Sequence, residues 1–367
     1  MKLVFLIISF LTTFVSANFI VISDIHYDQF YSVGASTKCF LGNTGMGCCR
    51  NFSVPLNGST PAREYGELTC DSPKALLDIT FKWLASLQVD YLVFLGDIVD
   101  HDLLIQNSTY NLNEINVLGN YFKTLPYPVY ALMGNHDGFI VDNLWDDGSG
   151  QEWIGYVQNS YGQPTVLGTT GYYTVVHNKV RFIFLNCLGY DTHNLEVLKY
   201  PKNDLFNQTA WFSSLIENVK KNNETVYLFS HFGSEIGEAT DFYNKMISSI
   251  DYPYITYFAG HSHHDEIRMM TNSSFFYINP SLVPDNHFPE VRHYLEENNS
   301  VIDYVQYGLN LTKAYLEGTV QFEVVYTAKN SYSLEDLSAQ SWSNFFSRME
   351  SNITLKNIYN SHVNWGV

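Results

Sequence analysis

The chain has 367 residues, and its 20 Lys+Arg against 37 Asp+Glu give a formal net charge of -17 with histidine neutral. Apolar residues make up 46% and charged residues 16%, which excludes a disordered or collagen-like chain and predicts a packed globular protein. The acidic balance argues against a long nucleic acid as partner, because phosphate backbones bind to basic surfaces, although a bound metal ion could still attract a small phosphorylated molecule.

The first 17 residues predict a secretory signal peptide. Lys2 precedes an apolar run over residues 3–15, and Ser16-Ala17 supplies the small residues of a cleavage site. The run is too short to cross a bilayer as a helix, and no later stretch reaches about 18 apolar residues. A buried first strand and a membrane anchor are the alternatives for this segment. We expect a secreted or lysosomal protein without a transmembrane anchor.

Sequons and cysteines agree with passage through the secretory pathway. Asn-x-Ser/Thr sequons, which together predict an N-glycosylated surface, begin at Asn51, Asn57, Asn107, Asn207, Asn223, Asn272, Asn298, Asn310 and Asn352. Four of the five cysteines fall between Cys39 and Cys70, and an oxidising compartment would join them in two disulfides. Adjacent Cys48 and Cys49 are expected to pair outward, for example as Cys39–Cys48 and Cys49–Cys70. Cys187 is expected to be a buried thiol.

Strands and helices are predicted to alternate along the chain. Short β-rich apolar runs lie at residues 18–23, 91–95, 129–133, 180–185, 225–230 and 255–259. Segments with helical periodicity lie at residues 73–88, 113–124, 208–222 and 238–250. This alternation predicts an α/β protein with buried, partly parallel sheets. Beyond about residue 290 the pattern changes to a Tyr/Val-rich run at 320–326 and a helical stretch at 334–351.

Polar residues follow these predicted strands where each one ends. They are Asp24 and His26 in the first case, Asp97 and His101 in the second, Asn135, His136 and Asp137 in the third, His231 after residues 225–230, and His261 and His263 after residues 255–259. In open α/β sheets, the loops at the carboxyl ends of strands converge on one crevice. Five strand ends are therefore expected to present metal-binding side chains to one place.

Apart from His101, His136 and Asp137, this set contains two carboxylates, one amide and four imidazoles. Such a set can hold two divalent cations about 3.5–4 Å apart, with one carboxylate bridging them. Mixed nitrogen and oxygen ligands favour Zn²⁺, Mn²⁺ or Fe²⁺ over Ca²⁺ or Mg²⁺. Taken singly, Asp-x-His has an ordinary explanation as a surface pair, Gly-Asp as a turn and His231 as a core histidine. Their joint occurrence favours the metal site.

The order Asp-x-His, Gly-Asp, Gly-Asn-His-Asp, a later His and Gly-His-x-His resembles that of the calcineurin-like metallophosphoesterases. The resemblance is closer to the acid sphingomyelinase-like phosphodiesterases and extends to residues 70–73, 278–281, 307–311 and 334–337. It implies a four-layer α/β/β/α sandwich as catalytic domain over residues 18–290, followed by a small helical C-terminal subdomain over residues 291–367. The predicted cleavage site leaves no room ahead of Asp24 for a saposin domain, so the saposin-less branch is expected.

The resemblance also implies a role for each motif residue. One metal would take Asp24, His26, Asp97 and His263, and the other would take Asp97, Asn135, His231 and His261. His101 and His136 match the two active-site histidines of the family that do not bind metal, and Asp137 would orient His136. Two Zn²⁺ ions are the expected cofactors, with Mn²⁺ or Fe²⁺ less favoured.

These roles imply a metal-dependent phosphoric diester hydrolase. A metal-activated hydroxide would attack phosphorus in line, and a protonated His101 or His136 would donate to the leaving alkoxide. The Ser/Thr phosphatases of this superfamily carry Arg where this chain has His101, and loss of that guanidinium favours diesters or pyrophosphates over monoesters. Asp100 stands where purple acid phosphatases need Tyr, so an iron–tyrosinate centre is not expected.

The substrate is expected to be a small phosphodiester, either a nucleotide or a phosphocholine-type molecule. The alternatives are a sphingomyelin phosphodiesterase, which would bind a lipid head group and release ceramide and phosphocholine, and a non-catalytic metal-containing binding protein. Residues 285–289 depart from the family's sequence, and His287 is there either a substrate contact or a surface histidine. The low charge density and the many sequons favour a monomer.

Overall fold

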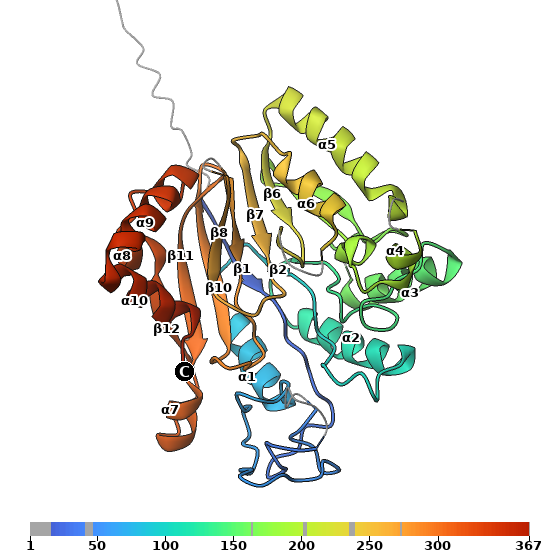
Figure 1. Ribbon diagram of the computed structural model, residues 1–367, viewed down its shortest axis with the longest axis vertical. Helices are drawn as coiled ribbons and strands as arrows, with labels where there is room; N and C mark the ends of the chain where they lie inside the picture. The colour runs from blue at the N-terminus through green and yellow to red at the C-terminus, as the bar shows by residue number, and fades with distance from the viewer. Residues whose placement is uncertain are drawn as a thin grey trace, which may run out of the picture.

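A computed structural model describes residues 16–40, 47–162, 164–200, 204–234, 239–271 and 274–366. Two six-stranded sheets pack face to face with helices on their outer sides, so the expected α/β/β/α sandwich is confirmed (Figure 1). The predicted signal peptide lies outside the described residues up to position 15, and Ser16 and Ala17 already belong to the first strand. Within the described residues no helix is both long and apolar enough to span a bilayer.

The first sheet has the order β12-β11-β10-β1-β2-β3. Its strands in chain order are β1 (Ser16–Ile22), β2 (Tyr91–Phe94), β3 (Val129–Ala131), β10 (Glu290–Glu297), β11 (Ser300–Leu309) and β12 (Phe322–Thr327). Strands β1, β2 and β3 run parallel, whereas β10 pairs antiparallel with β1 and continues into an antiparallel meander. The three parallel strands were predicted, the Tyr/Val-rich run at 320–326 overlaps β12, and β10 and β11 were missed.

The second sheet has the order β4-β5-β6-β7-β9-β8. Its strands are β4 (Tyr173–His177), β5 (Val180–Phe184), β6 (Thr225–Phe229), β7 (Ile255–Ala259), β8 (Glu266–Thr271) and β9 (Ser274–Ile278). Strands β5, β6, β7 and β9 are parallel, and β4 and β8 are antiparallel edges. Both sheets are therefore partly parallel, as the sequence predicts, and the parallel strands end at the same side of the molecule.

Ten α-helices are described, and five of them, namely α1, α2, α5, α6 and α9, match the predicted helical segments. They are α1 (Lys74–Leu84), α2 (Ser108–Phe122), α3 (Gly148–Tyr161), α4 (Leu195–Lys199), α5 (Gln208–Asn222), α6 (Asp241–Ser248), α7 (Leu311–Leu316), α8 (Ala328–Tyr332), α9 (Ala339–Ser351) and α10 (Ile353–Val363). Two short 3₁₀ helices, Cys187–Tyr190 and Leu205–Asn207, follow β5 and precede α5.

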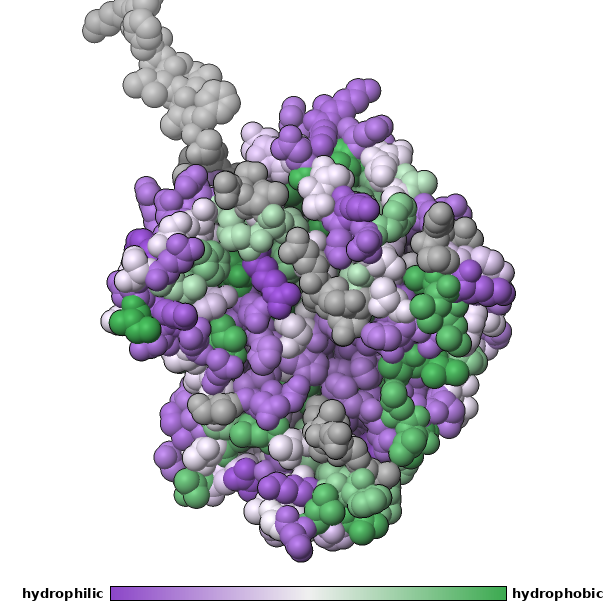
Figure 2. Space-filling model, viewed as in Figure 1, coloured by the Kyte–Doolittle hydropathy of each residue, from purple (hydrophilic) through white to green (hydrophobic). Residues whose placement is uncertain are grey.

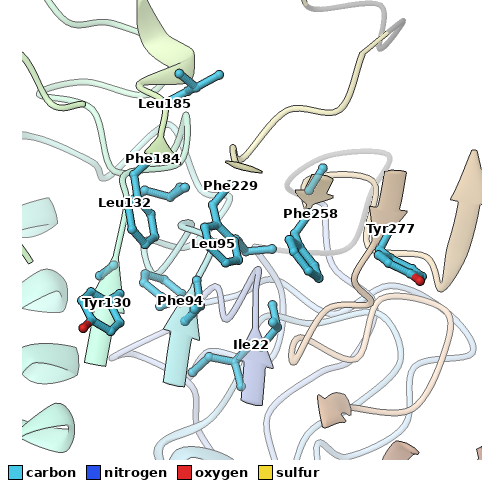
Figure 3. Close-up of a cluster of buried hydrophobic side chains, with 14 of the residues drawn as sticks. Ile22, Phe94, Leu95, Tyr130, Leu132, Phe184, Leu185, Phe229, Phe258 and Tyr277 are labelled. Carbon is cyan, nitrogen blue, oxygen red and sulfur yellow. The ribbon is translucent and has the colours of Figure 1, made fainter. Parts of the chain in front are cut away.

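Aromatic side chains fill the space between the two sheets (Figure 3). Phe19 of β1 stacks on Tyr91 of β2 with ring centroids 4.9 Å apart and meets Phe258 of β7 edge-on at 5.8 Å. On the outer face of the first sheet, Phe94 contacts Phe122 of α2. Because aromatic rings bury large apolar areas, this core fixes how the two sheets face each other.

Helices α8, α9 and α10 close one edge of the sandwich beside β12 (Figure 1). Trp342 of α9 is buried and contacts Tyr277 of β9 in the second sheet and Tyr332 of α8. Tyr332 in turn contacts Tyr326 of β12 in the first sheet. These helices thus join the two sheets, while β10, β11 and β12 extend the same sheet as β1. A domain boundary near residue 290 stays a prediction.

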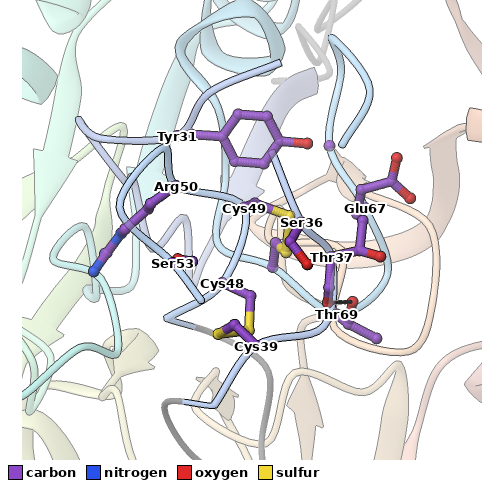
Figure 4. The surroundings of a disulfide bond; sticks show 12 residues. Tyr31, Ser36, Thr37, Cys39, Cys48, Cys49, Arg50, Ser53, Glu67 and Thr69 are labelled. Carbon is purple, nitrogen blue, oxygen red and sulfur yellow. Dashed lines mark hydrogen bonds between the residues drawn. A yellow bond between two sulfur atoms is a disulfide. The ribbon is translucent and has the colours of Figure 1, made fainter. Parts of the chain in front are cut away.

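Two disulfides staple the long segment between β1 and α1 (Figure 4). Cys39 pairs with Cys48 and Cys49 pairs with Cys70, which confirms the expected outward pairing. Cys187 is a buried free thiol, also as expected. The segment has little regular structure. Its two disulfides therefore supply the stability that a hydrophobic core would otherwise provide.

Candidate metal centre

The predicted donor side chains come together where the parallel strands of both sheets end. The first sheet supplies Asp24 and His26 after β1, Asp97 after β2 and Asn135 after β3, and the second supplies His231 after β6 and His261 and His263 after β7. A direct contact joins the two sheets here, because the His261 backbone N–H donates to Asp24 Oδ2 at 3.0 Å. The centre therefore lies at the seam between the sheets.

The backbone at this seam is strained. Five of the predicted ligands have left-handed φ angles, namely Asp24 (50°), His26 (43°), Asp97 (64°), His261 (69°) and His263 (63°). Residues other than glycine avoid this region at a cost of about 1–3 kcal/mol each, and such residues gather at functional sites. The same loops need glycine for close approach, since a Cβ on Gly134 would lie 2.0 Å from Asp97 Oδ1.

Hydrogen bonds determine which ring nitrogen of each histidine faces the centre. The Nδ1 atoms of His26 and His231 lie 2.7 and 2.8 Å from the carbonyl oxygens of Val99 and Leu95. The Nδ1 of His263 lies 2.9 Å from Asp285 Oδ2. Because these oxygens can only accept, each Nδ1 carries a proton, and in a neutral ring Nε2 then keeps its lone pair.

These Nε2 atoms crowd against one another and against carboxylate oxygens. The Nε2 atoms of His26 and His263 are 3.2 Å apart, and Nε2 of His231 lies 3.2 Å from His261 Nδ1. Asp97 Oδ2 lies 3.0 Å from His231 Nε2 and 3.7 Å from His26 Nε2, which puts it between the two histidine pairs. Facing lone pairs and carboxylates repel unless cations lie among them, so this donor set fits divalent metal ions.

The donor atoms divide into two groups. Asp24, His26 and His263 offer atoms within 4.8 Å of one another, and so do Asp97, His231 and His261. Asn135 belongs with the second group, because its Oδ1 lies 3.0 Å from His231 Nε2. The structure thus brings the donors together in the two sets that the family resemblance implies.

Electrostatics in the cluster favour an ionised Asp97 between charged neighbours. Burial alone would raise the pKa of Asp97, but His231 and His136 lower it below its ordinary value. Burial likewise opposes a charge on His231, yet Asp97 and Asp24 raise its pKa to about 9. A cation that binds here would displace the proton from His231, because metal ions and protons compete for the same lone pair.

His101 and His136 lie beside these two groups, and with His26 they offer a third set of ring nitrogens within 4.8 Å of one another. The rings of His101 and His26 stack with centroids 3.7 Å apart, and His136 meets His101 edge-on at 4.8 Å. The His101 Nδ1 lies 2.6 Å from Asp71 Oδ1, whereas the His136 Nδ1 lies 3.1 Å from the carbonyl oxygen of Asp100. Burial and nearby His263 lower the pKa of His101 to about 4.

The structure corrects the expected role of Asp137. The buried carboxylate accepts hydrogen bonds from the backbone N–H groups of Asp97, Ile98 and Gly134 at 2.8–2.9 Å. Its side chain therefore holds the loops after β2 and β3 together, and the carbonyl oxygen of Asp100, not Asp137, is the acceptor for the His136 ring. Burial and the charge of Asp97 raise the pKa of Asp137 to about 6.

Three further acids touch the site, and no sequence pattern predicts a role for any of them. Asp71 pairs with His101, Asp285 pairs with His263, and Asp142 Oδ1 accepts from Asn135 Nδ2 at 2.8 Å. Only the resemblance of residues 70–73 and the departure of residues 285–289 drew attention to two of these loops. His287 is buried against Ser281, so a surface histidine was the wrong alternative for it.

Comparison with known proteins agrees with this geometry. Residues 17–265 match the family described as calcineurin-like phosphoesterase. The chain belongs to this family. The solved structure of PhoD superposes on 85% of the chain and 69% of PhoD with a TM-score of 0.50 and 10% sequence identity, which supports the shared fold alone.

Curated relatives of this calcineurin-like phosphoesterase cover most of its length. Sphingomyelin phosphodiesterase A of Dictyostelium discoideum is 29% identical over 92% of this chain and 61% of that protein. Human cyclic GMP-AMP phosphodiesterase SMPDL3A is 25% identical over 87% of this chain and 76% of that protein. The chain thus spans less than two thirds of the amoebal relative and about three quarters of the human one.

A separate cavity of about 390 Å³, with both polar and apolar lining residues, lies away from the metal centre. It is lined at the amino ends of β7 and β9 and at the start of β11, for example by Ile255, Phe275 and Val301. None of the predicted site residues lines it. The polar seam between the sheets is therefore the candidate active site of this calcineurin-like phosphoesterase, and this cavity is not.

Proposed function

We propose that the protein is a secreted or lysosomal phosphodiesterase with two zinc ions that hydrolyses phosphodiester or pyrophosphate bonds in small molecules. The observation that carries this proposal is the orientation of His26, His231 and His263. Acceptors on Nδ1 turn the Nε2 atom of each ring toward Asp24 and Asp97. Imidazoles oriented in this way beside carboxylates are typical of metal sites, where a hydrogen bond at one ring nitrogen fixes the other ring nitrogen toward the metal ion.

The bound ions would supply Lewis acidity, which activates water and offsets charge on the phosphoryl oxygens. Asp24, His26, Asp97 and His263 would hold one ion, and Asp97, Asn135, His231 and His261 the other. His101 and His136 supply what the ions do not, namely a proton for the oxygen of the leaving alcohol. Both rings lie beside the donor groups, with 22% of the His101 side chain exposed.

A diester is the substrate class that suits the charges around the seam. His101 stands where a phosphomonoesterase of this superfamily would present an arginine, and the nearby Arg50 is buried among Asp28, Asp100 and Asp102. Without a free guanidinium, the second negative charge of a monoester lacks a bidentate partner. Phosphodiester groups, in dinucleotides as in phosphocholine-type diesters, carry only a single negative charge.

A sphingomyelin phosphodiesterase is a second candidate, favoured by apolar side chains beside the seam. Figure 2 shows a hollowed polar region at the centre of one face with hydrophobic residues along one side. Exposed apolar residues follow β2 and β3 on loops and β5 on helix α4, and they are Leu103, Leu104, Ile140, Leu195 and Leu198. An exposed apolar patch beside a catalytic site is typical of an enzyme that meets lipid aggregates. The name of the amoebal relative agrees with this candidate.

A substrate panel with matched metal analysis tests both candidates. Purified protein should contain two zinc ions per chain and hydrolyse bis(p-nitrophenyl) phosphate, and a chelator should remove metal and activity together. Soluble dinucleotides and glycerophosphocholine should be cleaved if the first candidate is correct, whereas turnover restricted to micellar sphingomyelin would favour the second. Two bound metals without hydrolysis of any diester would contradict both and leave a binding protein.

Secretion, glycosylation and the monomeric state belong to the same proposal. In the described residues, seven sequon asparagines are exposed and one is half-buried, as glycan attachment requires. The two disulfides are compatible with an oxidising compartment. Glycosidase treatment followed by mass measurement would reveal the glycans, and light scattering of the secreted protein should give the mass of one chain.

A further inference from the structure

We propose that Trp365 is a positioning residue of the metal centre, because it fixes the loop of residues 284–289, whose Asp285 orients the predicted ligand His263. This inference rests on the metal sites of the proposed function but goes beyond them. It assigns control over the affinity for one of the two ions to a residue that follows the last helix. The contacts lead from Trp365 through the loop to the imidazole ring of His263.

His263 differs from two other predicted histidine ligands in the acceptor that orients its ring. His26 and His231 turn their Nδ1 atoms to backbone carbonyl oxygens of buried residues, 2.7 and 2.8 Å away. His263 instead turns its Nδ1 to a side chain, Asp285 Oδ2 at 2.9 Å, and 33% of that side chain is exposed. The orientation of His263 therefore depends on where the loop places Asp285.

The loop that carries Asp285 is irregular but short and stiff. It contains no helix or strand, and Pro284 and Pro289 stand at its two ends. Each proline ring fixes the backbone φ angle of its own residue, which leaves the loop few torsions that can rotate. A displacement near one end of the loop is therefore passed on to Asp285, because little rotation is available to absorb it.

The loop has two anchors between its prolines. The Asn286 backbone N–H donates to the carbonyl oxygen of Leu68 at 2.9 Å, which ties the first half to the disulfide-stapled segment. The Phe288 backbone N–H donates to the carbonyl oxygen of Trp365 at 3.0 Å, and the Phe288 and Trp365 rings meet edge-on with centroids 5.2 Å apart. Without the Trp365 ring, Asp285 is held firmly from one side only.

The place of the Trp365 ring is built into strand β11. A Cβ on Gly308 of this strand would lie 2.1 Å from Trp365 Cζ3, so only glycine leaves room for the indole. Gly366 contributes in the same way, because a Cβ there would lie 2.5 Å from the Phe288 ring. The C-terminal end of the chain lies near α7, which directly follows β11 (Figure 1). This close fit fixes Trp365 against the sheet.

The contact acts on one ion site. His263 offers its donor atom in the same group as Asp24 and His26. In the other group, His231 is oriented by a backbone carbonyl oxygen directly after β2, which is independent of the loop. Contacts that orient a metal-binding histidine are worth about 10–100-fold in metal affinity. Loss of the Trp365 ring should therefore weaken the binding of one ion and spare the other.

The test measures the zinc affinity of each site by equilibrium competition between the zinc-loaded full-length protein and a chromophoric chelator. Ligand variants separate the sites, because His231→Ala should keep the ion of the first group and His263→Ala the ion of the second. In the His231→Ala background, Trp365→Ala should lower zinc affinity about 10-fold and Asp285→Ala about 10–100-fold. In the His263→Ala background, neither substitution should change it.

Two control variants separate positioning from general destabilisation. Trp365→Phe should retain zinc affinity close to that of the wild-type protein, because it keeps the backbone hydrogen bond and an aromatic ring against Phe288. Ile358→Ala removes a half-buried side chain from α10 and should lower the stability of the same region without changing zinc affinity. An equal loss of affinity in Ile358→Ala, or a loss in both ligand backgrounds for Trp365→Ala, would overturn the proposal.

The double variant supplies a readout that a merely structural role would not change. In the His231→Ala background, Trp365→Ala should have no further effect once Asp285 is replaced by Ala, because residues that act through one another are not additive. Independent, additive losses would show that Trp365 does not act through Asp285 and would overturn the positioning role.

Failure of this inference can be told apart from failure of the proposed function. If the wild-type protein binds two zinc ions and Trp365→Ala weakens one of them, but no diester is hydrolysed, the hydrolase function fails and the positioning role stands. If both ions bind to Trp365→Ala as tightly as to the wild-type protein, the positioning role alone fails. A wild-type protein that binds no zinc would overturn both.

Discussion

At the scale of single residues, Asp137 shows how a buried carboxylate supports a site that it does not face. Replacing it with Ala would leave the backbone N–H groups of Asp97, Ile98 and Gly134 without an acceptor. Each unsatisfied buried donor is costly, so Asp137→Ala should lower the free energy of unfolding by about 2–4 kcal/mol. Urea titration followed by circular dichroism would measure this.

The neighbouring residue supplies the control. His136 has a half-buried side chain, and its ring makes one long hydrogen bond to the Asp100 carbonyl oxygen. His136→Ala should therefore change the unfolding free energy by less than about 1 kcal/mol, within the usual range for such sites. Equal destabilisation by both substitutions would show that Asp137 has no special structural role.

The pH dependence of turnover follows from the environment of His101. Burial and His263 lower its pKa to about 4, so the protonated form that donates grows steadily as the pH falls from 8 toward 5. For alkyl diesters kcat/KM should rise over that range, as expected of an acid-requiring step. The measurement is a pH–rate profile of the wild-type protein and of His101→Ala. The variant should not show the rise in kcat/KM toward low pH. A flat wild-type profile would rule out histidine acid catalysis.

The sequence predicted the donor residues but not the acids behind them, for a physical reason. Asp97 and His261 follow buried strands directly, so the strand-end rule places them without knowledge of the fold. Asp71 and Asp285 reach their histidines from loops that are 30 and 22 residues distant in sequence. Such pairs exist only once the tertiary structure has formed, and no local pattern marks them.

At the scale of elements, strand β10 was missed because several of its buried residues are charged. Strand β10 carries Glu290, Arg292 and Glu296, all of them buried, and its pattern is not that of an apolar strand. Arg292 is satisfied by Asp265 and by Gln306 of β11, which only the assembled sheet provides. Buried charges that are paired in this way are invisible to hydrophobic patterning.

Helix α3 was missed for another reason. Its first residues include Gly148 and Gly150, which disfavour a helix in isolation. Asp147 compensates by accepting from the backbone N–H groups of Ser149 and Gly150. A Cβ on Gly150 would lie 1.8 Å from the Trp145 carbonyl oxygen, so packing requires the glycine that propensity penalises.

The disulfide-stapled segment makes a prediction at the same scale. Its Arg50 is buried and bonded to Asp28, Asp100 and Asp102, which ties the segment to the loop after β2. Arg50→Met should lower the unfolding free energy by about 3–5 kcal/mol, because three buried carboxylates lose their partner.

Arg63 on the same segment is the matched control for Arg50. Its side chain is 46% exposed and pairs with Glu67. Arg63→Met should cost less than about 1 kcal/mol, because exposed ion pairs contribute little. Denaturant titrations of both variants under oxidising conditions would compare them. If Arg50→Met lowered the unfolding free energy no more than Arg63→Met does, the ion pairs of Arg50 would not be what holds the segment to the core.

At the scale of the whole molecule, the metal centre belongs to neither sheet alone. Strands β1, β2 and β3 supply Asp24, His26, Asp97 and Asn135, and strands β6 and β7 supply His231, His261 and His263. The two sets meet only when the sheets dock. Ions that bind this seam bind the folded state and not the unfolded one, so their binding free energy adds to the stability of the whole sandwich.

Removal of metal should therefore lower the unfolding temperature of the entire molecule in one transition. An ion present at 100 times its dissociation constant stabilises the folded state by about 2.7 kcal/mol, so loss of two ions should lower Tm by about 5–10 °C. Calorimetry with and without chelator would measure the shift, and added zinc should restore it. His231→Ala, which removes a ligand from the seam, should shrink the response to chelator by about half. A chelator-insensitive Tm in a protein that contains zinc would mean that the ions lie elsewhere.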